Sequence, residues 1–258
     1  MPPANVLVHY HIFKNAGSSI DACLEQSLGE RWGRFEGAHA HEILASSRML
    51  QYLHSRPDLL AISSHLTRPP LPHPDCLPVI FVRHPLLRAY SVYTFTRSDT
   101  TQPFADVAQN LGFCEYIQWA LRKEPGSIVI RDYQVVHLSQ ASWRGDHILN
   151  TTATQADYEE ARALLSEWGM AGVVEQFERS VLVYQAMYGA RIPGLQLVPR
   201  WENATCRQVI SLEERIGHLR NVLGETLYSD FMAVNQLDLA LHTHARVLLE
   251  NAATRLGV

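Results

Sequence analysis

Residues 6–20 read Val6-Leu7-Val8-His9-Tyr10-His11-Ile12-Phe13-Lys14-Asn15-Ala16-Gly17-Ser18-Ser19-Ile20. An apolar, β-branched run, typical of a buried strand, stops at a short segment of small residues, and a predicted helix over 18–28 follows at once. A strand, a small-residue turn and a helix in this order can cradle an oxyanion. The reason is that the turn's backbone N–H groups and the positive end of the helix converge on one point. Lys14 adds a mobile positive charge and the two serines add hydroxyl donors, so this stretch predicts a ligand that carries phosphate or sulfate.

A second strand-to-helix junction lies at residues 79–95, which read Val79-Ile80-Phe81-Val82-Arg83-His84-Pro85-Leu86-Leu87-Arg88-Ala89-Tyr90-Ser91-Val92-Tyr93-Thr94-Phe95. The predicted strand ends at Arg83, and the chain enters a helix through Pro85, whose missing N–H suits a first helical turn. Arg83 and Ser91, about two helical turns apart, can face the same cleft. The planar donor fork of arginine matches a phosphate, so we expect a second anion contact here. Arg88 is interpreted as structural.

The remainder of the chain alternates predicted strands and helices. Strands are predicted at 6–12, 59–63, 79–82 and 170–174, and helices at 18–28, 39–54, 86–97, 113–122, 155–168, 177–188, 211–222 and 226–252. Strands separated by helices indicate a parallel sheet covered on both faces, with ligands at the carboxyl ends of the strands. The 258 residues contain no linker or internal repeat. We therefore predict one α/β domain, residues 1–258, with a central, mostly parallel sheet and a P-loop-like strand-loop-helix.

Composition limits the partners and the compartment. The net charge is −4 and there is no basic stripe, so we expect no nucleic-acid partner and a substrate that is small or weakly charged. No signal peptide and no membrane-spanning run is found, which predicts a cytoplasmic protein. The oligomeric state is left open. Four scattered cysteines are interpreted as reduced, mostly buried thiols: Cys23, Cys76, Cys114 and Cys206.

No metal site is predicted. His39 and His41 are two residues apart in a predicted helix, where their side chains point in different directions. No third ligand is evident beside them.

The two junctions together resemble the sulfotransferases that use 3′-phosphoadenosine 5′-phosphosulfate (PAPS). The chain carries Lys-x-Ala-Gly-Ser-Ser after its first strand and Arg-x-Pro-x-x-Arg-x-x-Ser-x-Tyr after a later one. The likeness is closest to the carbohydrate O-sulfotransferases that include the heparan sulfate 2-O-sulfotransferases. Their first motif usually has proline where Phe13 stands.

Four further segments resemble the family in order, more weakly. They are residues 61–65, 132–138, 171–178 and 235–241. The second of these is similar to Asn-x-Gln-Thr-Arg-x-Leu, with Asp132 for the asparagine and Val136 for the arginine. In the first, Ser64 stands for the glycine of a Gly-His pair.

The resemblance implies PAPS as the donor, without a metal, and a small-molecule or saccharide acceptor. Because eukaryotic members of the family are Golgi membrane proteins, it also allows the Golgi lumen, but only if the sequence is a trimmed form. The residues that it implies for the donor are Lys14, Asn15, Ala16, Gly17, Ser18, Ser19, Arg83, Ser91 and Arg200. The first loop would hold the 5′-phosphosulfate and the Arg83–Ser91 pair the 3′-phosphate, with a late loop at Arg200 and Asn203 closing over it. Lys14 would meet the charge that develops on the leaving phosphate. His65 would take the acceptor's proton, since histidine is matched to that task near neutral pH.

Ordinary structural interpretations remain open at this point. Lys14 could be a surface lysine, Arg83 an ion-pair partner and His65 a histidine bonded to backbone. Asp132 and His137 are candidates for the acceptor side.

Two other function classes are also considered. A nucleotide kinase would need Gly-x-x-x-x-Gly-Lys-(Ser/Thr) with the lysine last, and the chain has no such string. A non-catalytic nucleotide-binding module would keep Lys14 and Arg83 but tolerate loss of His65.

Overall fold

The computed structural model describes residues 5–39, 42–122, 129–144, 151–200, 202 and 211–258. Five strands form one sheet: β1 (Leu7–Tyr10), β2 (Trp32–Arg34), β3 (Ala61–Ser64), β4 (Leu77–Val82) and β5 (Gly172–Val173). Their order is β2-β3-β1-β4-β5, and every pairing is parallel. Because β1 lies between β3 and β4, the chain changes direction across the sheet at β1, which is where ligands bind in open parallel sheets.

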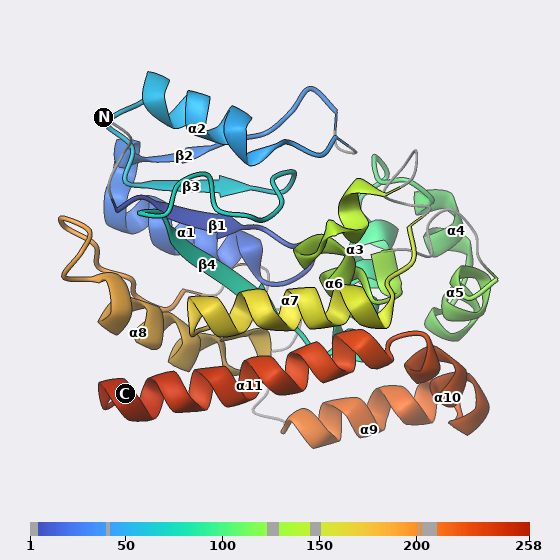
Figure 1. Ribbon diagram of the computed structural model, residues 1–258. Helices are drawn as coiled ribbons and strands as arrows, with labels where there is room; N and C mark the ends of the chain where they lie inside the picture. Colours follow the sequence, from blue (N-terminus) through green and yellow to red (C-terminus); the bar gives the residue numbers. More distant parts are fainter. Residues whose placement is uncertain (1–4, 40–41, 123–128, 145–150, 201, 203–210) are drawn as a thin grey trace.

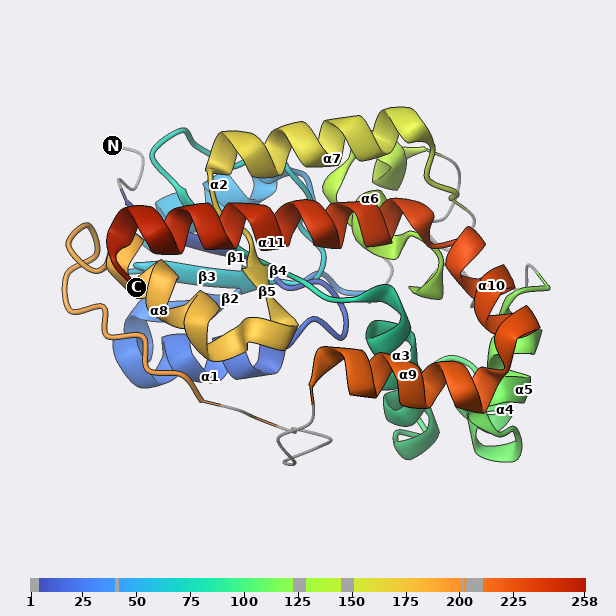
Figure 2. The same cartoon turned by 90° about the horizontal axis from the view of Figure 1, so that it is seen from below.

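Helices cover both faces of this sheet. Figure 2 shows α1 (Gly17–Leu28) and α8 (Phe177–Tyr188) on one side and α7 (Gln155–Trp168) on the other. The long C-terminal helix α11 (Gln236–Leu256) runs beside β5 and packs on both α7 and α8. Helix α2 (Ser46–Ser55) lies along the β2–β3 side of the sheet (Figure 1). The α/β architecture predicted from the sequence is confirmed.

A second group of helices lies beyond the carboxyl ends of the strands (Figure 1). It contains α3 (Pro85–Ser98), α4 (Ala105–Asn110), α5 (Phe113–Ala120), α9 (Leu212–Leu223) and α10 (Glu225–Ala233). These helices share an apolar core of their own, separate from the core around the sheet. The short helix α6 (Tyr133–Leu138) packs against α7 and α11. The 3-10 segments are η1 (Gly29–Arg31), η3 (Gln140–Trp143) and η5 (Val174–Gln176). The loops that follow the strands therefore lie between two packed bodies of helices and sheet.

Besides the short helices α4 and α6, which were not predicted, the predicted elements differ most from the structure in three places. The edge strand β2 was not predicted, because its three residues are too few to show a periodic pattern. Helix α2 begins at Ser46 rather than at 39, since Leu44 instead forms a parallel bridge with Thr67. The predicted helix 226–252 is two helices, α10 and α11.

Asn235 explains the break between α10 and α11. Its side-chain amide donates to the carbonyl oxygen of Phe231 (3.0 Å), and its side-chain oxygen accepts from the backbone N–H of Asp132 (3.1 Å). Asparagine side chains that bond to backbone in this way compete with a continuous helix. The Asp132 carboxylate then accepts the N–H of Asp238 in the first turn of α11 (2.7 Å). Asp132, considered from the sequence for the acceptor side, thus holds the start of this helix.

In the described part of the chain, no helix is both long and apolar enough to cross a bilayer. Cys23, Cys76 and Cys114 are free thiols, and Cys206 lies outside the described residues.

Candidate functional site

The loop between β1 and α1 presents backbone N–H groups at the start of a helix. Lys14 (φ 63°) and Ala16 (φ 60°) adopt the left-handed conformation, which costs about 1–2 kcal/mol for a non-glycine residue. The N–H groups of Ala16, Gly17 and Ser18 have no acceptor within the described residues. Because the positive end of α1 lies at the same place, this loop can bind an anion through its backbone.

The His11 ring lies directly against Gly17, so a larger residue does not fit at position 17. A Cβ at position 17 would lie 1.9 Å from the Cδ2 and Nε2 atoms of His11. The His11 ring is itself buried, and burial lowers its pKa to about 4, against the opposing effect of the Asp21 carboxylate. The neutral imidazole of His11 therefore lies against the anion-binding loop at pH 7.

The Lys14 side chain lies over an aromatic ring in a cationic environment. Its Nζ is 4.0 Å from the centre of the Phe95 ring, an arrangement that stabilises the ammonium group. Burial, and then the charges of Arg83 and Arg88, lower the pKa of Lys14 to about 8. Phe95 in α3 thus supports the Lys14 ammonium group.

Arg83 joins the two strand-to-helix junctions. Its Nη1 donates to the carbonyl oxygen of Lys14 at 3.0 Å. Its Nε has no partner among the described residues, and burial lowers its pKa to about 10. Ser91 is buried in α3 and makes no hydrogen bond to Lys14 or Arg83 within the described structure. The two predicted anion contacts at Lys14 and Arg83 are thus adjacent.

Arg88 supports the same loop from α3. Its Nε donates to the carbonyl oxygen of Phe13 (3.2 Å) and its Nη1 to that of Val129. The guanidinium lies 4.4 Å from the centre of the Tyr133 ring. Its Nη2 has no partner among the described residues although the side chain is buried. These contacts agree with the structural role predicted for Arg88.

No described carboxylate lies within 4.0 Å of the cationic groups of Lys14, Arg83 or Arg88. Glu175 and Asp238 act on the two arginines only from farther away. Positive charges that are removed from water without a close counter-ion are costly. An anion bound between the two junctions would offset that cost.

Gln134 connects the two strand-to-helix junctions through its side-chain amide. Its Oε1 accepts from the Nδ2 of Asn15 and from the backbone N–H of Arg83, both at 2.8 Å. Its Nε2 donates to the Arg83 carbonyl oxygen (2.9 Å) and to Asp238 (3.0 Å). Asn15 also donates to the Phe81 carbonyl oxygen (2.7 Å), so its amide N–H groups are committed to the fold rather than open to a ligand.

The remaining predicted donor residues lie at the start of α1 and in the late loop. Ser18 is exposed at the helix start, whereas Ser19 is buried and its Oγ accepts the backbone N–H of Glu202 (3.0 Å). Arg200 is exposed, and its Nε donates to the Glu202 carboxylate (2.7 Å). The late loop thus reaches α1, but the Arg200 guanidinium has its own carboxylate partner. Asn203 lies outside the described residues.

His65 follows β3 and stands beside the first loop. Its Nδ1 lies 2.8 Å from Oε1 of Glu36, and its ring stacks on that of His11 with centres 3.7 Å apart. His11 is therefore in contact with both the anion-binding loop and His65. The side chain of His65 is 44% exposed, so the ring is open to a second substrate.

Two more buried side chains, Arg68 and His137, lie near His65. Arg68 donates through Nη1 to the carbonyl oxygens of His65 (2.8 Å) and Thr67 (3.2 Å), and no described carboxylate lies within 4.0 Å of it. His137 is fully buried, and neither ring nitrogen has a partner among the described residues. Burial lowers the pKa of His137 well below its usual value, and nearby Arg68 lowers it further.

One trio among the described residues has the donor atoms of a metal site: His9, His11 and Asp21, with ligand atoms within 4.8 Å of one another. His9 Nδ1 is hydrogen-bonded to the Asp21 carboxylate at 3.0 Å, and His11 Nδ1 lies 3.3 Å from the same carboxylate, so Asp21 is already paired with the two imidazoles. The Arg34 guanidinium lies 3.7 Å from the same carboxylate, and its positive charge disfavours binding of a metal cation there. Of the histidine pair considered from the sequence, His41 lies outside the described residues.

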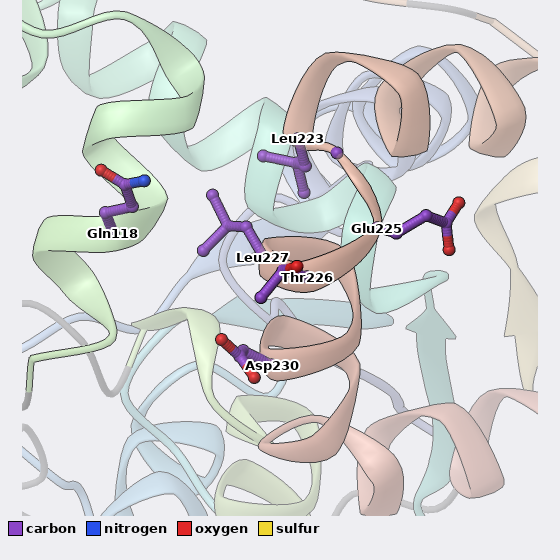
Figure 3. Close-up of a pocket in the computed structure, with 7 residues that line it drawn as sticks. Gln118, Leu223, Glu225, Thr226, Leu227 and Asp230 are labelled. Carbon is purple, nitrogen blue, oxygen red and sulfur yellow. The ribbon is translucent and has the colours of Figure 1, made fainter.

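A surface hollow of about 380 Å³ lies elsewhere, between α5 and the α9–α10 turn (Figure 3). Its lining includes Gln118, Leu223, Leu227 and Asp230. None of its lining residues belongs to the site around Lys14, Arg83 and His65.

Comparison with known proteins assigns no family to the chain. No family model matches it. A protein of Archaeoglobus fulgidus, described as "Uncharacterized protein", is 27% identical over 246 residues, which cover 92% of this chain and 94% of that protein. The similarity extends along nearly all of both chains and carries no activity with it.

Sequence reasoning missed three residues of this site: Glu36, Arg68 and Gln134. Gln134 had a signal, because it keeps the glutamine of the Asn-x-Gln-Thr-Arg-x-Leu segment that the sequence resembles. Glu36 and Arg68 belong to no recognised motif, and only the parallel pairing of β2 and β3 brings Glu36 to His65.

Proposed function

We propose that this protein is a PAPS-dependent O-sulfotransferase that transfers the sulfuryl group to an alcohol of a sugar, glycoside or small metabolite. The observation that carries the proposal is the 3.0 Å hydrogen bond from Arg83 to the Lys14 carbonyl oxygen. It makes the two junctions neighbours, so one nucleotide with two anionic groups can be held by both. The half-buried Lys14 and Arg83 and the buried Arg88, which have no close carboxylate among the described residues, supply the charge that such a ligand requires.

The residues divide the binding of the donor between them. The N–H groups of Ala16, Gly17 and Ser18, with Lys14, would hold the 5′-phosphosulfate. Arg83 and, from α3, Ser91 would hold the 3′-phosphate. The proposal gives no direct contact with the donor to Asn15, whose amide N–H groups bond to Phe81 and Gln134, or to Arg200, whose Nε is paired with Glu202.

The transfer is an in-line displacement at sulfur. The acceptor oxygen forms the new O–S bond while the S–O bond to the 5′-phosphate breaks, which releases 3′-phosphoadenosine 5′-phosphate (PAP). Lys14 meets the negative charge that grows on the leaving phosphate. His65 takes the acceptor's proton on its ring nitrogen. Its exposure and its place next to the loop, through His11, suit that role.

A thermal-shift comparison tests the proposal directly. PAP should raise the melting temperature, because a ligand at about 100 times its Kd stabilises a protein by about 2.7 kcal/mol. A screen of PAPS with sugars, phenols and metabolite alcohols should then show a product with the mass of one added SO₃ group. Stabilisation by ATP with Mg²⁺ but not by PAP would instead favour a phosphotransferase. PAP binding without any sulfated product would favour a binding module.

A further inference from the structure

We infer that Glu36 is a positioning residue that holds His65 as the general base; the inference rests on the proposed function. Glu36 makes two kinds of hydrogen bond to the same residue. Its Oε1 lies 2.8 Å from the His65 Nδ1, and the His65 backbone N–H donates to Oε1 (3.2 Å) and Oε2 (3.4 Å). The carboxylate therefore fixes both the backbone and the ring of His65.

This pairing decides which ring nitrogen can accept a proton. A carboxylate only accepts hydrogen bonds, so Nδ1 must carry the proton in the Glu36 contact. The neutral ring then has an unprotonated Nε2, which has no protein partner among the described residues. Nε2 is thus the atom left to accept the proton of an acceptor alcohol.

His11 and Arg68 restrict the ring further. The His11 ring stacks against His65, and His11 cannot move toward the loop because Gly17 lies on it. Arg68 holds the His65 carbonyl oxygen through Nη1 (2.8 Å). The imidazole is therefore held at one edge by Glu36 and on one face by His11, while its remaining edge is left for substrate.

The sheet itself brings Glu36 and His65 together. Glu36 follows the edge strand β2 and His65 follows β3, and the two strands are paired in parallel. The backbone N–H of Phe35 continues this pairing by donating to the Ser63 carbonyl oxygen (2.9 Å). Both residues thus leave the same edge of the sheet at the same level. The short strand β2 thus places the Glu36 carboxylate beside His65.

The test compares Glu36→Gln and Glu36→Asp with wild type and with Glu178→Gln, a control on the exposed side of α8. Turnover uses PAPS and an alcohol found in the screen above. Glu36→Gln should lower kcat by about 10–100-fold, less than the ~10²–10⁴-fold that a positioned base contributes, because His65 itself remains. The KM for PAPS, the PAP affinity and the melting temperature should stay close to wild type, since Glu36 does not touch the donor loop. Glu36→Asp should retain more turnover than Glu36→Gln.

A second measurement does not depend on turnover. Nitrogen-15 NMR of the histidine rings reports which nitrogen carries the proton, and wild type and Glu178→Gln should show His65 protonated at Nδ1. In Glu36→Gln the Nε2-protonated form should increase, because the amide NH₂ can donate to Nδ1. Unchanged kcat and tautomer in Glu36→Gln would overturn the inference, and so would parallel losses of kcat, PAP affinity and stability. If wild type neither binds PAP nor sulfates any alcohol, the proposed function fails first, and the role of His65 as a base fails with it.

Discussion

Lys14 combines an unusual backbone conformation with a cationic environment. It is left-handed (φ 63°), half-buried and placed over the Phe95 ring. Burial and two neighbouring guanidinium groups lower its pKa to about 8. A bound anion would stabilise the Lys14 ammonium group, because its negative charge offsets the repulsion from the neighbouring arginines.

The first prediction concerns the pH dependence of donor binding. The Lys14 ammonium is present below its pKa and is lost as the pH rises through about 8, so PAP affinity should fall between pH 7 and pH 9.5. Lys14→Arg should flatten this fall, because a guanidinium stays charged throughout the range. Calorimetric titration of PAP at several pH values measures both. Equal pH dependence in the two proteins would show that Lys14 is not the titrating group.

The second prediction separates binding from catalysis at Lys14. Lys14→Ala should reduce kcat by about 10²–10³-fold, the loss typical of one preorganised donor to a developing charge. PAP affinity should fall by a smaller factor, since the charge that Lys14 meets grows in the transition state. Steady-state kinetics with PAPS, set beside PAP titrations, measures the two effects. A loss confined to affinity would make Lys14 an anchor only.

The third prediction tests the contact between the loop and His11. Gly17→Ala should weaken PAP binding at least about 10-fold and lower stability by about 1–3 kcal/mol, the usual cost of overpacking. The reason is that the added Cβ would overlap the buried His11 ring. The matched control is Gly217→Ala in α9, where a Cβ meets nothing within 4 Å and alanine should stabilise the helix slightly. Chemical denaturation and PAP titration of both variants decide the matter.

At the scale of elements, the site depends on two junctions being held at a fixed separation. Gln134 in α6 does this with bonds to the first loop, to the end of β4 and to α11. It is fully buried, so each bond it makes is protected from water. A buried group that loses its partner costs about 1–3 kcal/mol.

The fourth prediction follows from this arrangement. Gln134→Ala should lower the free energy of unfolding by about 2–4 kcal/mol, because the Arg83 N–H and the Asp238 carboxylate lose buried partners. PAP affinity should fall as well, although Gln134 does not contact the ligand. Gln155→Ala, on the exposed start of α7, should cost less than about 0.5 kcal/mol and leave PAP affinity unchanged. Full PAP affinity in Gln134→Ala would refute the role of Gln134 in holding the junctions.

At the scale of the whole molecule, buried histidines make stability depend on pH. Burial lowers the pKa of His84 to about 4, with His242 and Arg246 lowering it further and Glu175 opposing them. His11 and His137 are shifted in the same direction. These groups are neutral in the folded state, whereas in the unfolded chain they bind protons below about pH 6.5. Their contribution to stability is present above pH 6.5 and is lost as the pH falls toward 4.

The fifth prediction isolates His84 from this set. Its Nδ1 accepts the Leu86 N–H (3.3 Å) as the N-cap of α3, and asparagine can replace that contact without titrating. Between pH 7 and pH 5, His84→Asn should therefore lose about 2 kcal/mol less stability than wild type. Urea denaturation at both pH values gives the comparison. Asp132, with a pKa raised to about 7 by burial and by Asp238, acts in the opposite direction but equally in both proteins. Equal losses would mean that His84 is already charged in the folded state.

Much of the fold could be predicted from local sequence. The strand at 6–12 and the helix at 18–28 correspond to β1 and α1, and the helices at 155–168 and 177–188 match α7 and α8. Apolar runs and helical periodicity are local properties, so they survive in any tertiary context. The edge strand β2 and the break at Asn235 were missed, because both depend on partners distant in the sequence, β3 and Asp132.

The order of residues by itself determined an α/β fold with a small-residue turn after the first strand and an arginine after a later one. Periodicity and turn chemistry act over a few neighbours, which is why the chain alone carried that much. Only the tertiary structure decided that Arg83 bonds to the Lys14 loop, that Gln134 holds both, and that Glu36 rather than backbone faces His65. These contacts join residues 29 to 119 positions apart. Parallel strand pairing sets such contacts, and no local pattern in the chain encodes it.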